Sequence, residues 1–127
     1  MRAAVFLLLG SAFVAALASC AASGVKHAPV LDSLTAPTDV ALDTAKNKYP
    51  LVLTVVFHDE DDDAKSIRID LQGYPSQTIV FGDTSLTQTL TVELGAGFKG
   101  QTVSYTVQVI DAQSLASNPE LRTVKLL

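Results

Sequence analysis

A run of five consecutive carboxylates, Asp59 to Asp63, contains the side chains of this sequence that are best suited to bind an ion. So much negative charge in one short segment is unfavourable unless water, salt or a bound cation relieves the repulsion. A calcium ion takes about six to eight oxygen ligands, often from carboxylates. In a twelve-residue calcium-binding loop, Asp59, Asp61 and Asp63 would stand at positions one, three and five, and Asp70 at position twelve. This spacing makes a calcium site one interpretation of the acidic run.

Several departures from that calcium loop leave a solvated turn without metal as the alternative. Ala64 stands at position six, where the sharp turn needs glycine, and Asp70 has a shorter side chain than the bidentate glutamate. The flanking residues also have the pattern of strands instead of helices. Asp70 can pair with Arg68 or Lys48 on a strand surface. Ca²⁺ is therefore the one cofactor that the sequence suggests, and only in the first of these two interpretations.

The two histidines, His27 and His58, do not form a recognisable catalytic or zinc site. Neither histidine has a second histidine or a cysteine at the spacing of zinc ligands. His58 and Asp59 are neighbours in a strand-like segment, so their side chains are expected on opposite faces and cannot act as a base and its orienting partner. No Gly-x-Ser-x-Gly motif supplies a nucleophile. The sequence predicts a protein that is not an enzyme.

A late loop, Asp111 to Glu120, combines polar residues with one leucine and is a candidate for ligand binding. Loops that a rigid scaffold positions carry many of the binding residues of proteins. The residues expected to contact a ligand there are Asp111, Ser114, Leu115 and Asn118. The alternative is a spacer in which Leu115 tucks against the core.

The single cysteine stands at the end of an apolar amino-terminal segment. Met1 and Arg2 give a positively charged start, Ala3 to Leu17 form an apolar run, and the run ends in Leu17-Ala18-Ser19-Cys20. A charged region, an apolar region and a site of small residues together describe an export signal. The apolar run is too short to span a bilayer, which takes about 20 apolar residues.

The motif Leu17-Ala18-Ser19-Cys20 resembles the lipobox of bacterial lipoproteins. In that family the cysteine receives a diacylglyceryl group, and cleavage makes it the amino terminus, which carries acyl chains such as palmitate. The resemblance implies a signal peptide of residues 1–19 and a lipidated tether of residues 20–29. Ala21, in place of the aspartate that retains such proteins at the inner membrane, points to the outer membrane of the cell envelope. A buried free cysteine or an ordinary signal cleaved after Ala18 are the alternatives.

Composition excludes several further classes of protein. The chain has 127 residues, a formal charge of -4 and one cysteine, so it is too short for a multidomain enzyme and has no disulfide framework. Loss of Arg2 with the signal peptide makes the mature chain more acidic still. Nucleic-acid binders usually carry a basic surface, so we expect no nucleic-acid partner.

Apolar and polar residues alternate with period two along most of the mature chain, which is the pattern of half-buried antiparallel strands. Strands are expected at residues 66–71, 86–94 and 103–109, with shorter ones at 30–34, 77–81 and 121–126. Leu86 is expected on the buried face of its strand. Residues 51–57 form an apolar run that predicts a central strand, apolar on both faces. About seven strands in residues 30–127 predict an all-β antiparallel sandwich.

These strands resemble immunoglobulin-like and fibronectin type III-like modules of bacterial exported proteins. The resemblance rests on the strand that enters the acidic turn, residues 55–63, and on the segment 104–111 followed by a last strand. It implies an immunoglobulin-like β-sandwich. Tyr105 matches the position of a tyrosine corner, whose hydroxyl bonds back to the preceding connection; a plain buried tyrosine is the alternative. The disulfide and the core tryptophan of antibody domains are missing.

A lipid anchor joined to an all-β domain without an active site predicts a membrane-anchored, non-catalytic binding or structural module of the bacterial cell envelope. The expected partners are the membrane, through the lipid on Cys20, and an envelope protein or polysaccharide. The alternative function is a calcium-binding adhesion-type module that uses the Asp59–Asp63 turn. The fold cannot choose between them, because one sandwich architecture serves many functions.

Overall fold

The computed structural model describes residues 26–127, so the predicted signal peptide, Cys20 and the first part of the tether lie outside the described residues. Nearly all regular structure in residues 26–127 is β-strand, and no helix there is long and apolar enough to cross a membrane. The elements are β3 (Val30–Thr35), β4 (Asp39–Val40), β5 (Lys48–His58), β6 (Ala64–Leu71), β7 (Gln77–Val80), β8 (Thr87–Gly95), the 3-10 helix η2 (Ala96–Phe98), β9 (Thr102–Asp111) and β10 (Glu120–Leu126).

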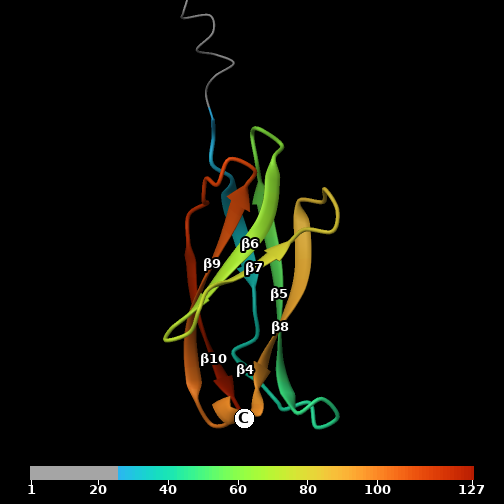
Figure 1. The fold of residues 1–127 in the computed structure, drawn as a ribbon, viewed down its shortest axis with the longest axis vertical. Coiled ribbons are helices and arrows are strands. Elements are labelled where there is room, and N and C mark those ends of the chain that lie inside the picture. The colour runs from blue at the N-terminus through green and yellow to red at the C-terminus, as the bar shows by residue number, and fades with distance from the viewer. Residues whose placement is uncertain (1–25) are drawn as a thin grey trace, which may run out of the picture.

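Two sheets form a sandwich whose strands run roughly along the long axis of the molecule (Figure 1). One sheet has five strands in the order β4-β10-β9-β6-β7, and the other has three in the order β3-β5-β8. The pairings are antiparallel except for that of β4 with β10, in which Asp39 lies beside Lys125. The predicted all-β antiparallel sandwich is confirmed. The two-residue strand β4 and the short 3-10 helix η2 are the elements that the sequence did not predict.

The core lies between the two sheets and follows from the alternation of apolar residues. In β9 the buried apolar side chains are those of Val103, Tyr105, Val107 and Val109, as the pattern predicted. The predicted inward residues of β6, Ile67, Ile69 and Leu71, are also buried. Full burial of one such side chain contributes about 1.5–3 kcal/mol, so this alternation accounts for much of what holds the sheets together.

The central strand β5 is apolar on both faces but is buried on only one of them. Leu51, Leu53 and Val55 are buried, whereas Val52 between them is 46% exposed. The three-stranded sheet is covered by the other sheet on one face, and its opposite face meets solvent. The expectation of a central strand in this sheet is therefore correct, but its second apolar face is not part of the core.

Two single-residue expectations differ from the structure. Leu86 is 49% exposed, because β8 begins only at Thr87 and Leu86 belongs to the connection before it. Tyr105 is buried, but its hydroxyl has no hydrogen-bond partner in the described part of the chain, so the hydrogen bond of a tyrosine corner is not made. Burial raises the pKa of the Tyr105 hydroxyl. It is Tyr49 whose hydroxyl ties chain segments together, by donating to the carbonyl of Leu127 at 2.7 Å.

Candidate functional site

The acidic turn joins β5 to β6 at the end of the sandwich where the chain enters the domain (Figure 1). Asp59 is only 7% exposed, and its carboxylate accepts hydrogen bonds from the backbone N–H groups of Asp63 at 2.8 Å and Asp61 at 3.3 Å. Its carbonyl accepts the N–H of Asp62 at 3.1 Å. Asp59 therefore holds the turn in shape from inside, which is a common role of aspartate in turns.

Asp61 binds the tether instead of pointing at a common ligand site with Asp59. The backbone N–H of His27 donates to one carboxylate oxygen of Asp61 at 2.7 Å, and the His27 ring lies 3.1 Å from the other. The other ring nitrogen of His27 lies 3.4 Å from Glu60. The hydrogen bond to Asp61 raises the pKa of His27, and the same contacts lower the pKa of Asp61. We call this contact the His27 clasp.

Asp63 lies near Asp111, a carboxylate from a different strand, and the sequence did not predict that these two acids would be neighbours. Among residues 26–127, Oδ1 of Asp63 finds no hydrogen-bond partner although it is buried, and the same holds for Oδ2 of Asp111, a residue only 2% exposed at the end of β9. The two segments are joined by the N–H of Ala112, which donates to the carbonyl of Asp63 at 2.8 Å. Burial first, then the nearby Asp59 and Asp111 carboxylates, raise the pKa of Asp63.

Asp70 does not belong to this end of the molecule, which corrects the predicted twelve-residue loop. It lies near the far end of the extended strand β6, about 20 Å from Ala64 at about 3.3 Å per residue. Its side chain accepts a hydrogen bond from Ser76 and lies 3.3 Å from the Arg68 side chain. In a calcium-binding loop, the residue at position twelve lies close to position one because the chain between them curls around the ion. Here the residues from Ala64 to Leu71 form an extended strand, which carries Asp70 away from Asp59. Pairing with Arg68, which was the alternative, is what the structure contains.

The late loop, residues 111–120, folds back on the domain, and most of its polar side chains make hydrogen bonds that hold it there. Oδ1 of Asp111 accepts the N–H groups of Gln113 and Leu115, both at 2.8 Å. Asn118 accepts the N–H of Leu31 at 2.9 Å and donates to its carbonyl at 3.2 Å, which joins the loop to β3. Of the four residues proposed to contact a ligand, Asp111 and Asn118 are thus structural, and Ser114 keeps an exposed side chain.

His58 and Asp59 point to opposite sides, as the strand geometry predicted, since His58 is exposed and Asp59 buried. The His58 ring lies 2.8 Å from the carboxylate of Asp32 on β3. Within residues 26–127, no group of three or more His, Cys, Asp or Glu side chains is arranged to hold a metal ion.

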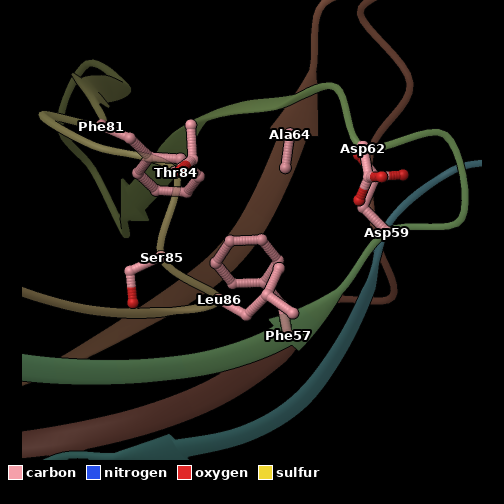
Figure 2. A pocket seen from close by; sticks show the side chains of 8 residues that line it. All are labelled: Phe57, Asp59, Asp62, Ala64, Phe81, Thr84, Ser85 and Leu86. Carbon is pink, nitrogen blue, oxygen red and sulfur yellow. The ribbon is translucent and has the colours of Figure 1, made fainter.

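A hollow of about 370 Å³ opens beside the acidic turn, between the end of β5 and the connection from β7 to β8 (Figure 2). It is lined by Phe57, Asp59, Asp62, Ala64, Phe81, Thr84, Ser85 and Leu86. The rings of Phe57 and Phe81 stack with their centroids 5.3 Å apart. Sequence reasoning missed this site because its residues come from two segments that only the fold brings together. The sequence did single out the acidic run, which supplies Asp59 and Asp62, and a strand at residues 77–81 that ends in Phe81, but nothing in it joined the two.

Comparisons with known proteins address the fold. No family model matches the chain, and no curated protein matches it. A solved structure, the PKD domain of an M14-like peptidase from a Thermoplasmatales archaeon, is similar, with 16% sequence identity and a TM-score of 0.56. The similarity covers 80% of this chain and 98% of that chain. A PKD domain is immunoglobulin-like, so the comparison confirms the predicted immunoglobulin-like fold. At this identity it concerns the fold alone.

Proposed function

We propose that this chain is a bacterial lipoprotein, anchored by lipid on Cys20 to the envelope, most simply the outer membrane, where its β-sandwich acts as a non-catalytic binding or structural module. The observation that carries the proposal is the lipobox-like motif Leu17-Ala18-Ser19-Cys20 ahead of an immunoglobulin-like domain. The fold fits such a module. Its expected partner is a protein or polysaccharide of the envelope.

The way in which the chain enters the domain supports this arrangement. Cys20 and Lys26 are six residues apart, so the chain between them reaches at most about 20 Å. His27, which follows at once, is bound to the acidic turn by the clasp. A domain held by lipid on Cys20 would therefore keep its acidic end close to the bilayer. Several acyl chains, at about 0.8 kcal/mol per buried methylene, would make that attachment lasting.

Replacement of Cys20 tests the anchor. We expect Cys20→Ala to abolish incorporation of radiolabelled palmitate and to move the protein from the membrane fraction to the soluble fraction of a bacterial host. Ser23→Ala, a neighbouring small change that keeps the cysteine, should leave both readouts unchanged. A wild-type chain that takes up no palmitate, or a Cys20→Ala chain that stays in the membrane, disproves lipid anchoring through this residue.

One observation favours a second candidate function, calcium binding at the acidic turn. Oδ1 of Asp63 and Oδ2 of Asp111 are buried carboxylate oxygens that have no hydrogen-bond partner in the part of the chain that the structure describes, and such groups are costly to leave unpaired. Calcium, with waters completing its shell, would satisfy both. The ligand set would then be Asp63 and Asp111, because Asp59 and Asp61 accept backbone hydrogen bonds and Asp70 is distant.

Calorimetric titration of the full chain in detergent with calcium chloride tests this second candidate. We expect heat of binding at millimolar calcium and a rise in melting temperature, both lost in Asp111→Asn. That variant keeps an oxygen for the N–H groups of Gln113 and Leu115, so the loop should stay folded. Magnesium chloride at equal ionic strength is the control for screening. No heat and no rise in melting temperature would rule out the calcium function.

A further inference from the structure

The hollow beside the acidic turn has an apolar, aromatic floor. Phe57 and Phe81 stack at 5.3 Å with only 18° between their planes, and Leu86 borders them with about half of its surface exposed. Figure 2 shows the Phe57 ring between the Phe81 ring on one side and the two aspartates on the other. The volume of about 370 Å³ lies in the range of ligand pockets, which run from about 300 to 1,000 Å³.

One wall of the hollow is acidic, and its lining contains no basic residue from the described range 26–127. Asp59 and Asp62 stand on that wall, followed by the uncharged Ala64, Thr84 and Ser85. Asp59 is fixed by two backbone N–H groups. Asp62 is exposed, and within residues 26–127 its side chain enters no hydrogen bond or ion pair. The hollow thus offers stacked rings and a free carboxylate within one cavity, next to a turn with three further acids.

We propose that this hollow receives a long cationic side chain, arginine or lysine, from a basic segment of a partner protein. The alkyl stem would lie on Phe81 and Leu86, above the buried ring of Phe57, and the cationic head would reach the Asp62 carboxylate at the rim. Long cationic side chains combine these two properties, since they bury an apolar stem and keep the charged head at the surface. Cations also bind favourably against aromatic faces, and guanidinium groups stack on them more readily than ammonium groups.

Charge complementarity argues for this occupant over a neutral or anionic one. The chain is acidic overall, and its densest acidic run borders the hollow. An anionic ligand would be repelled. A purely apolar ligand would displace water from the Asp62 carboxylate and would offer it no polar contact in exchange. The inference deepens the proposed binding role of the domain and rests on that role, but it does not depend on lipidation of Cys20.

Binding of short peptides to the full chain in detergent, followed by ¹⁵N–¹H NMR, tests the proposal. The probes are acetyl-Gly-Ser-Xaa-Ser-Gly-amide peptides in which Xaa is arginine, lysine, citrulline, norleucine or glutamate. We expect the arginine peptide to shift the amide signals of Phe57, Ala64, Ser85 and Leu86, with lysine weaker. The neutral citrulline and norleucine peptides should bind at least fivefold more weakly, and the glutamate peptide should not bind.

Two variants separate the charge from the aromatic floor. Asp62→Asn should weaken binding of the arginine peptide about fivefold and leave binding of the norleucine peptide unchanged. Asparagine tolerates the positive φ of 53° at this position, so the turn should keep its shape. Phe81→Ala should weaken binding of both the arginine and the norleucine peptide. Glu93→Gln removes the same charge from β8 near Gly95, away from the hollow, and should change neither.

The proposal is overturned if the neutral peptides bind as tightly as arginine, if Asp62→Asn has no effect, or if the shifted signals lie outside the hollow. Spermidine binding more tightly than the arginine peptide would overturn the assignment to a protein side chain. None of these outcomes affects the palmitate and fractionation results on Cys20, so the peptide-binding proposal and the lipid-anchor proposal can fail separately.

Discussion

Asp59 and Asp61 carry the same functional group two positions apart, yet they hold different segments of the chain. Asp59 points inward and accepts the N–H groups of its own turn, whereas Asp61 accepts the backbone of His27 from the tether. Asp63 and Asp62 also differ, because Asp63 is half-buried near Asp59 and Asp111 whereas the Asp62 side chain is exposed. Charge density predicted an unusual site at this turn, but sequence spacing alone cannot tell which carboxylates face each other.

The His27 clasp should respond to pH. The pKa of His27 is raised above its ordinary value of about 6.5 by the hydrogen bond to Asp61. The stabilisation is therefore fully present below the ordinary value and is lost as the pH rises through the raised pKa. We expect Asp61→Asn to return the pKa of His27 towards its ordinary value. NMR titration of the imidazole signals measures this, and Glu93→Gln, which removes a distant acid, should not change the His27 titration.

If His27 titrates identically in Asp61→Asn and in the wild-type chain, the tether is not bound to the acidic turn in solution. The proposal that the acidic end of the domain lies close to the bilayer would then lose its support, while the proposal of a lipid anchor on Cys20 would not.

At the scale of strands, the alternation of apolar residues predicted most of the sandwich because burial of one face imposes period two. The strands β6 and β9 have the buried residues that this pattern indicated. The strand β4 escaped prediction because two residues are too few to show a period. The hollow and the Asp63–Asp111 contact escaped it because they depend on which strands are neighbours, and pairing partners such as Ala64 and Asp111 are far apart in sequence.

The two apolar faces of β5 should differ sharply in their contribution to stability. Leu53 is fully buried between the sheets, so Leu53→Ala should lower the free energy of unfolding by about 2–5 kcal/mol. Val52, its neighbour on the solvent face, is the matched control, and Val52→Ala should change it by less than about 0.5 kcal/mol. Urea unfolding of both variants measures the difference. Equal effects would mean that the outer face of β5 is covered in solution.

At the scale of the whole molecule, the two sheets share one core and are also joined at their ends. Asn118 follows β9 of the five-stranded sheet and binds both backbone groups of Leu31 in β3 of the other sheet. The carbonyl of Leu127 accepts the Tyr49 hydroxyl at the opposite end. Such links across the sandwich favour unfolding of both sheets in one step.

We expect Asn118→Ala to lower the free energy of unfolding by about 1–3 kcal/mol, because it leaves the backbone groups of Leu31 without partners. The single thermal transition should shift as a whole. Asn118→Asp keeps an acceptor for the Leu31 N–H and should cost less. Calorimetry measures both variants. A second transition in Asn118→Ala would indicate that the sheets unfold independently.

The chain enters the sandwich at one end of its long axis and leaves it at the other (Figure 1). Tension applied between the two ends of the domain, Lys26 and Leu127, would thus pull along the strands. Ladder hydrogen bonds lie perpendicular to the strands, so many of them would be loaded in shear together instead of opening one after another. An arrangement of this kind resists mechanical extension, so the sandwich should stay folded under a pull that would open a domain whose strand pairs separate one bond at a time.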